Sequence, residues 1–298
     1  MAVEARRGTL HPAGPPVHSV LRGTESVSLE EINRRWGLVI EREGVAGDRV
    51  ERAIRRATRD GGFDDVDPRW VDFLASNLQV CAFLSQETAR VLDRAADRCQ
   101  WGEISRSITL EASMLVRQAQ AQVLYAMDLE PLSRETPMDC ARAQWHGGRA
   151  WQPARQMLER LSLRDDWAEI LVGVNLCFEP LVAQLIRFEW GTRLASELGD
   201  TTTPIVAEAT QIQQAWLRDW TVATLRALLE HPSHGEANRS HLRRWLAAWG
   251  ERAREAAAAL TTLTADLPDP AAGTESYARV CDDHRAIVAS LDLDGGHA

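Results

Sequence analysis

The 298-residue sequence contains no lysine, so all 34 of its basic residues are arginine. They are outnumbered by 43 acidic residues, which gives a formal net charge of -9. Binding to a phosphate backbone needs a concentrated positive surface, so we do not expect this acidic chain to bind nucleic acid. Arginine in place of lysine supplies planar guanidinium groups, which suit protein interfaces with carboxylates.

Cysteine is scarce as well. The five residues are far apart and form no Cys-x-x-Cys pair; they are Cys81, Cys99, Cys140, Cys177 and Cys281. An odd number at wide spacing argues against a disulfide framework and against a metal held by cysteine. We expect Cys81, Cys99 and Cys177 to be small buried side chains on helices.

The sequence also lacks an uninterrupted apolar segment long enough to span a membrane. Its most apolar stretch, residues 170–186, is broken by Asn175, Glu179 and Pro180. No secretory signal follows the N-terminal residues MAVEARR. We therefore expect a cytoplasmic protein with no membrane partner.

The chain has helical periodicity almost throughout and no convincing period-2 strand. Residues 1–27 include the proline-rich run LHPAGPPVH and are expected to form an extended N-terminal arm. Residues 28–298 show no linker and no internal repeat, which predicts a single helical domain. Ser28, with a carboxylate three residues later, predicts a capping box, and a short helix is expected over 48–59.

Four long segments dominate, at residues 67–98, 103–129, 165–199 and 203–230. Their apolar residues alternate at spacings of three and four, as antiparallel helices packed at a shallow angle require. Each segment would be roughly 40 Å long at 1.5 Å per residue. With one longer connection, 131–164, they predict a four-helix bundle with a crossover.

Two further features complete the expected fold. Additional helices over 238–260 and 275–291 are expected to cover one side of the bundle. Pro180 lies inside the third long segment, where it should leave the backbone carbonyl of Leu176 without its helical partner and kink the helix.

A long four-helix bundle raises the question of a di-iron site, which takes Glu-x-x-His pairs from two helices and a Glu from each of the others. None of the eight histidines lies on the four long segments. Glu111 and Glu208 come near, but Met114 and Gln211 occupy the positions that imidazoles would need. The two glutamates are either ordinary charges on helix faces or remnants of lost metal ligands. Under both interpretations, we expect no catalytic, cofactor-binding or metal-binding residue in this chain.

Other functional motifs are equally sparse. The sequence has no Gly-x-Gly-x-x-Gly, Walker or Gly-x-Ser-x-Gly motif. His231 and His234 have a spacing that would suit a metal, but they follow a helix end and are expected to be solvated. Asn77, Gln118 and Gln122 lie on apolar stripes, so they should either hydrogen-bond across helices or mark a face that meets another subunit.

An ordered series of sequence strings extends from residue 67 to about residue 260. It consists of DPRWVDFL (67–74), WQPARQMLER (151–160), DWAEILVGVNL (166–176), EPL (179–181), GDTTTP (199–204), NR (238–239) and WLAAW (245–249). The series resembles the β (small) subunit of the hydroxylase component of bacterial multicomponent di-iron monooxygenases. That group includes methane, propane, phenol, toluene and alkene monooxygenases.

The resemblance implies an all-α, ferritin-like bundle that acts as a non-catalytic structural subunit. In that family a larger α subunit carries the di-iron centre, and β and α form an (αβ)2 hetero-oligomer, with a γ subunit in some members. A coupling protein and a reductase with flavin and iron–sulfur groups complete the system. It oxidises a hydrocarbon or aromatic substrate with O2 and NAD(P)H.

Two other interpretations stay open at this point. One is a self-sufficient ferritin-like di-iron oxidase, and the other is a helical adaptor unrelated to oxygen chemistry. The first would require metal ligands within this chain, and the second would require no monooxygenase partner.

Overall fold

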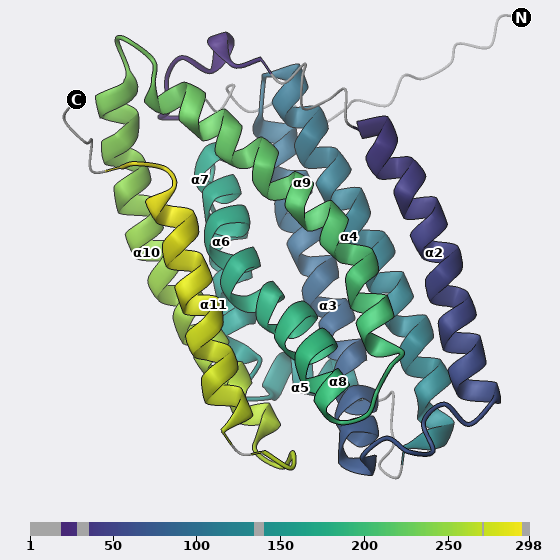
Figure 1. Cartoon of the computed structure of the whole chain (residues 1–298). Coiled ribbons are helices and arrows are strands. Elements are labelled where there is room, and N and C mark those ends of the chain that lie inside the picture. The colour runs from purple at the N-terminus through teal and green to yellow at the C-terminus, as the bar shows by residue number, and fades with distance from the viewer. Residues whose placement is uncertain (1–18, 29–35, 134–139, 270, 294–298) are drawn as a thin grey trace, which may run out of the picture.

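A computed structural model describes residues 19–28, 36–133, 140–269 and 271–293, and every regular element in those ranges is a helix or a helical turn (Figure 1). The all-α prediction is therefore confirmed. The long helices are α2 (Trp36–Arg59), α3 (Pro68–Arg98), α4 (Gly102–Leu129), a continuous helix over Trp167–Glu197, α9 (Thr203–Leu229), α10 (Gly235–Thr261) and α11 (Ala272–Ala289). The short elements are η1 (Thr24–Ser26), η2 (Glu130–Leu132), α5 (Cys140–Gly147), α6 (Gln152–Ser162) and η5 (Thr262–Thr264).

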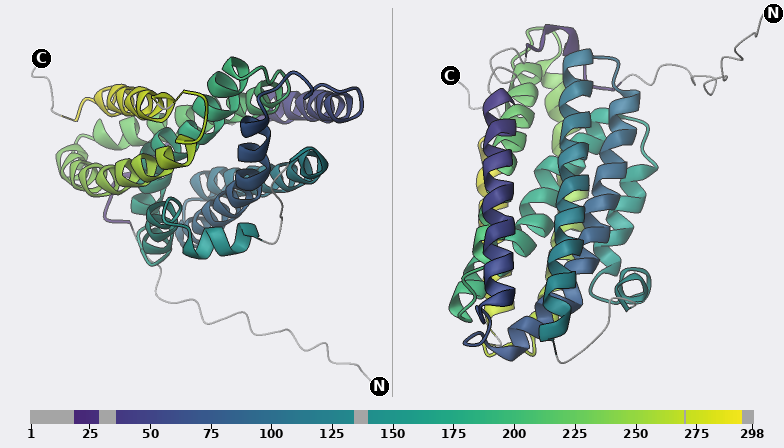
Figure 2. Two further views of the ribbon diagram at one scale, coloured as in Figure 1. Left: turned by 90° about the horizontal axis from the view of Figure 1, so that it is seen from below. Right: turned by 90° about the vertical axis from the view of Figure 1, so that its right-hand side faces the viewer.

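The four long segments predicted from periodicity form the bundle. They are α3, α4, the Trp167–Glu197 helix and α9, and α3 and α4 pack along each other's length. Seen from two further directions, α2 lies on one side of this bundle, against α9 and α4, while α10 and α11 cover the opposite side (Figure 2). The crossover contains α5 and α6, which pack on α3, and α6 also contacts α10.

Helix starts follow from local capping chemistry. The Asp67 carboxylate accepts a 2.9 Å hydrogen bond from the backbone N–H of Arg69, and Pro68 occupies the first helical turn of α3. Asp166 caps the Trp167–Glu197 helix, because its side chain accepts hydrogen bonds from the backbone N–H groups of Ala168 and Glu169. These caps fix where the core helices begin.

The Trp167–Glu197 helix changes its hydrogen-bonding pattern along its length. It opens with α7 (Trp167–Leu171), continues as π-type turns through η3 (Val172–Ala183) and η4 (Leu185–Leu194), and closes with α8 (Ala195–Glu197). Pro180 thus lies in a wider helix, a form usually confined to single turns. The imidazole of His284 on α11 donates to the backbone carbonyl of Leu176, the group that the sequence predicted to lack its helical partner.

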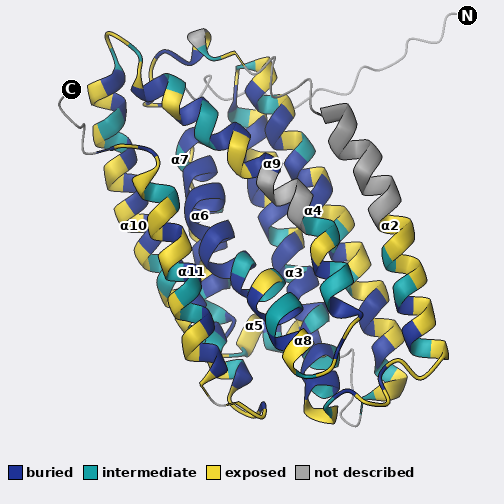
Figure 3. Cartoon of the chain, viewed as in Figure 1, coloured by how far each residue is buried: buried dark blue, intermediate teal, exposed yellow. Residues whose placement is uncertain are grey.

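The core runs through the centre of the bundle, where the dark residues of Figure 3 gather. Every residue of η3 is buried, including the apolar stripe predicted from the sequence. By length and composition the Trp167–Glu197 helix would be able to cross a bilayer, but 83% of its most apolar window is buried inside the fold. It is therefore accounted for as the core helix of the bundle.

The helix expected over 48–59 is longer than predicted. In the structure α2 begins at Trp36 and runs through Gly44 and Gly47 before it ends at Arg59. Glycine lowers helix stability by roughly 1 kcal/mol relative to alanine. Because of the two glycines, the first half of α2 could not be predicted as helical from its sequence. Packing of α2 against α9 and α4 offsets that cost.

The N-terminal segment is only partly described. The predicted capping box at Ser28 depends on residues 29–31, and most of the predicted arm is residues 1–18; both lie outside the described residues. Where it is described, the segment is tied to the bundle: the N–H of Val20 donates to Asp166 at 2.7 Å, and the N–H of Arg22 donates to Asn238 at 2.9 Å. The division into an arm over 1–27 and one domain over 28–298 stays a prediction.

Candidate functional site: a buried polar cluster in the bundle core

A cluster of polar side chains lies where α4, η3, η4 and α9 face one another. Glu111 of α4 has no exposed surface. The Asn175 carboxamide of η3 donates to the Glu111 carboxyl group at 3.0 Å and to the Thr221 hydroxyl of α9 at 2.9 Å. Asn175 therefore joins three of the four bundle helices through one side chain.

The second half of the cluster is a buried ion pair. Glu179 of η3 and Arg187 of η4 are in direct contact, and both side chains are about one-tenth exposed. Breaking this pair would be costly, because removal of either partner would leave an uncompensated charge in the core. Arg187 thus holds a carboxylate that would otherwise be available to a cation.

The Glu111 carboxyl group has an unusual protonation state. Its pKa is raised from 4.5 to about 8, mainly by burial; the neighbouring Glu179 carboxylate also raises the pKa, whereas the hydrogen bond from Asn175 and the charge of Arg187 lower it. At neutral pH the group is mainly a neutral carboxylic acid. One of its oxygens, Oε1, has no hydrogen-bond partner among the described residues.

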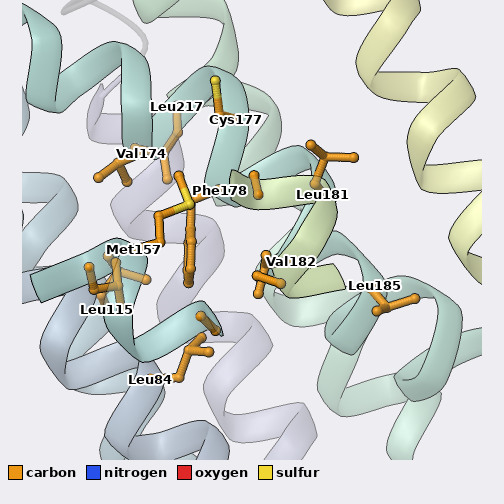
Figure 4. Close-up of a cluster of buried hydrophobic side chains, with 14 of the residues drawn as sticks. Leu84, Leu115, Met157, Val174, Cys177, Phe178, Leu181, Val182, Leu185 and Leu217 are labelled. Carbon is orange, nitrogen blue, oxygen red and sulfur yellow. The ribbon is translucent and has the colours of Figure 1, made fainter. Parts of the chain in front are cut away.

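The surroundings of the cluster are apolar. In Figure 4, Phe178 of the central helix lies beside Met157 of α6, Leu115 of α4 and Leu84 of α3, while Leu181 and Leu185 lie farther along the central helix. A cavity of about 50 Å³ borders Asn175, Glu179 and Arg187. That space accommodates water but is far smaller than the ~300–1,000 Å³ of typical ligand pockets.

These donors do not fit a di-iron centre. Such a centre needs several ionised carboxylates and two imidazoles around one pair of ions. Here Glu111 is protonated and bound to an amide, Glu179 is neutralised by Arg187, and Met114 stands one turn after Glu111. Within the described ranges, no group of three or more His, Cys, Asp or Glu side chains is placed to hold a metal.

The two near-miss glutamates behave differently. Glu111 is buried in the core, so the interpretation of it as an ordinary surface charge was wrong. Glu208 is exposed and pairs with Arg49 of α2 at 3.1 Å, as a helix-face charge does. The side chain of Gln211 lies outside the described residues.

The other polar residues singled out in the sequence serve packing. Asn77 donates to the Phe73 carbonyl of its own helix at 2.8 Å. Gln122 accepts from Ser85 at 3.1 Å, which confirms the expected bond across helices for that residue. The rings of His231 and His234 stack with centroids 4.7 Å apart in the turn before α10.

Cys81, Cys99 and Cys177 are buried, as predicted, but Cys99 lies just beyond the end of α3 and not on a helix. Burial raises the pKa of the Cys81 and Cys177 thiols to about 12 and that of Cys99 to about 11. All three thiols are protonated at neutral pH and therefore poor nucleophiles.

A second polar group closes one end of the bundle. The buried carboxylate of Asp200 accepts from the indole N–H of Trp70 on α3 at 2.9 Å and from the backbone N–H of Thr203 at 2.9 Å. The Thr203 hydroxyl lies 2.7 Å from the Tyr125 hydroxyl of α4. This chain of bonds locks α3, α4 and the start of α9 together.

The sequence reading did not assign Asn175, Glu179, Arg187 or Thr221 to a shared site. Their only sequence signal is that Asn175 and Glu179 interrupt the most apolar segment of the chain. A polar residue in such a segment must find a buried partner, and the partners come from other helices.

Comparison with known proteins gives consistent matches. Residues 41–232 match the family model described as Methane/Phenol/Alkene Hydroxylase. The chain is 29% identical over 265 residues, 88% of its length and 72% of the relative, to the hydroxylase component small subunit of propane 2-monooxygenase from Rhodococcus jostii (strain RHA1). It is 30% identical over 151 residues, 48% of its length and 38% of the relative, to the component A beta chain of methane monooxygenase from Methylococcus capsulatus (Bath).

Solved structures agree on the fold. A chain of phenol hydroxylase from Pseudomonas sp. OX1 superposes with a TM-score of 0.73 at 16% identity, covering 86% of this chain and 75% of that one. A chain of toluene 4-monooxygenase gives 0.70 at 18% identity, covering 81% and 77%. The fold is therefore that of a hydroxylase helical bundle.

Proposed function

Because this chain belongs to the Methane/Phenol/Alkene Hydroxylase family, we propose that it is the non-catalytic structural β subunit of a soluble di-iron monooxygenase hydroxylase. The observation that carries this proposal is the composition of the core cluster. A protonated Glu111, bound by Asn175, and a Glu179 neutralised by Arg187 stand where this kind of bundle would place metal ligands. Such a bundle is a scaffold, and the chemistry belongs to a companion subunit.

The proposed partners follow the same assignment. The companion is an iron-bearing α subunit in an (αβ)2 assembly, served by a coupling protein and by a reductase with flavin and iron–sulfur groups, with a γ subunit where the system has one. The complex oxidises a hydrocarbon or aromatic substrate with O2 and NAD(P)H in the cytoplasm. This chain supplies no group that touches the substrate.

An exposed apolar stripe supports an obligate partner. Among the large apolar side chains left exposed, one set lies on α4 and the turn after it: Val116, Val123, Leu124, Met127 and Leu132. Arg117 and Asp128 are the charged exposed residues between Val116 and Leu132. Contiguous apolar surface that includes methionine and has few charges is typical of the centre of a subunit interface.

An apolar groove adjoins this stripe. It has a volume of about 250 Å³ and lies between α4, α2 and α9, with Leu78, Met114 and Val206 in its walls. Gln118 borders the same groove, which favours the second of the two roles predicted for it, a face that meets another subunit. Obligate interfaces resemble a core cut in half, and this surface has that character.

Co-expression tests the assignment. A tagged version of this chain, produced together with a large hydroxylase subunit from the same organism, should retain that subunit in equal amount through size-exclusion chromatography. An adaptor unrelated to oxygen chemistry would leave the large subunit unbound. A self-sufficient oxidase would consume O2 in the absence of the large subunit.

A further inference from the structure

A pocket on the far side of the bundle lies between α10 and α11, which run side by side in Figures 1 and 2. Its volume is about 530 Å³, within the ~300–1,000 Å³ range of small-molecule sites. The pocket is separate from the polar core cluster and from the apolar stripe on α4. Its walls contain three arginines and one aspartate, with aliphatic side chains between them.

The arginines are not equivalent. The Arg243 guanidinium contacts the backbone carbonyl of Leu293, and Arg285 is exposed and paired with Asp282 on its own helix. Arg254 is partly buried, and no carboxylate pairs with it anywhere in the described ranges. A partly desolvated guanidinium without a counter-charge is unfavourable. An anion that binds to Arg254 would supply the missing counter-charge without having to displace a carboxylate.

The position of the Arg254 head group is set by Gly250 and His284. A Cβ atom at Gly250 would lie 3.3 Å from Nη1 of Arg254 and 3.5 Å from Cε1 of His284. The Arg254 and His284 side chains therefore both lie against the part of α10 where Gly250 has no side chain. The His284 ring is fixed by its hydrogen bond to the Leu176 carbonyl. Burial and the neighbouring Arg254 charge lower the pKa of His284 to about 4, so the imidazole is neutral and Arg254 is the cation at this point.

The rest of the pocket is aliphatic. Leu246 and Ala247 of α10 face Val288 and Ala289 of α11, and Leu293 closes one edge. A small inorganic anion would leave these walls without a partner. An aliphatic chain attached to the anionic head would cover them and gain the hydrophobic contribution of burial.

We propose that this pocket binds an amphipathic monocarboxylate, with the carboxylate at Arg254 and the aliphatic chain along Leu246 and Val288. A guanidinium donates two parallel hydrogen bonds to a carboxylate, and this paired geometry makes the interaction specific. The site is independent of the role of the chain in a hydroxylase and takes no part in oxygen chemistry.

Isothermal titration calorimetry of the full-length protein with octanoate tests the proposal. Octan-1-ol, which has the alkyl chain without the charge, and acetate, which has the carboxylate without the long alkyl chain, are the control ligands. Octanoate should bind at one site per chain, and each control probe should bind at least about tenfold more weakly, since each loses either the charge-assisted bonds or the apolar burial. Equal binding of octan-1-ol, or no octanoate binding, would overturn the proposal.

Matched variants locate the site. Arg254→Gln should weaken octanoate binding by about tenfold or more, whereas Arg244→Gln, at an exposed residue of α10 that does not line the pocket, should leave it within about twofold. Ala247→Trp fills the pocket from an exposed position and should abolish binding even if Arg254→Gln fails to fold. Circular dichroism confirms that each titrated variant is folded. Unchanged binding in Arg254→Gln or Ala247→Trp would place the ligand elsewhere and contradict the proposal.

Discussion

The carboxamide of Asn175 donates a 3.0 Å hydrogen bond to the carboxyl group of Glu111 at the centre of the bundle. This contact holds an amide against a carboxylic acid in the buried core of the bundle. Burial keeps the proton on the carboxyl group, against the hydrogen bond from Asn175, which lowers the pKa. Asn175 extends the link to Thr221 of α9. The bundle is closed by hydrogen bonds between helices.

The raised pKa of Glu111 predicts a loss of stability as pH rises from about 4.5 to about 8. The pKa rises from 4.5 in the unfolded chain to about 8 in the fold, so between these values only the unfolded chain gives up the proton. The free energy of unfolding should therefore fall as pH rises through this window, by up to ~1.4 kcal/mol per pH unit. Urea unfolding at several pH values measures the slope.

Glu111→Gln is the matched variant for this prediction. Glutamine keeps the shape but does not titrate, so the part of the pH dependence contributed by residue 111 should vanish. A wild-type slope identical to that of Glu111→Gln would show that Glu111 is already ionised in the folded protein.

His284 predicts the opposite trend on the acid side. Its pKa is lowered from 6.5 to about 4, so as pH falls from 6.5 toward 4 only the unfolded chain takes up the proton. Stability contributed by the neutral imidazole is complete above pH 6.5 and is lost toward pH 4. His284→Gln retains an N–H donor for the Leu176 carbonyl and should flatten the acid limb in urea unfolding. An unaltered acid limb would contradict the assignment.

Removal of Asn175 should be costly. Asn175→Ala leaves Glu111 and Thr221 without their shared donor, and each unsatisfied buried group costs about 1–3 kcal/mol, so a loss of about 2–4 kcal/mol is expected. Chemical denaturation gives this value. Ser113→Ala is the control, because Ser113 is exposed on α4 and bonds only to the Thr109 carbonyl of its own turn. If Asn175→Ala and Ser113→Ala lowered the free energy of unfolding by the same amount, Asn175 would not be the residue that links the bundle helices.

The apolar stripe on α4 predicts a separable effect on assembly. Leu124 is 63% exposed, so Leu124→Glu should leave the thermal unfolding of the isolated chain almost unchanged. It should reduce co-purification of the large hydroxylase subunit, because a charge would be buried in the interface. Leu163→Glu, at a residue 77% exposed and remote from α4, should not. Equal retention by both variants would assign the interface to another surface.

The helices of the bundle could be predicted because their signals are local. Alternating spacings of three and four identified α3, α4, the central helix and α9. The first half of α2 was missed because Gly44 and Gly47 weaken the local helix signal.

The polar cluster was only partly accessible from the sequence. Glu111 and Glu208 have the same local pattern, a glutamate one turn before a non-histidine residue, yet one is buried and the other pairs with Arg49 on the surface. Only the rotation of each helix in the bundle separates them. The pairing of Glu179 with Arg187 likewise depends on the π-type turns of η3 and η4, which local propensity does not indicate.

The central claim is that hydrogen bonds and an ion pair take the place of a metal in this bundle. Iron analysis of the purified chain, produced alone in iron-replete cells and compared with the complex that contains the large subunit, tests it most directly. The account predicts background iron in the chain alone, identical in Glu111→Gln, and stoichiometric iron in the complex. Stoichiometric iron in the chain alone, lost in Glu111→Gln, would contradict it.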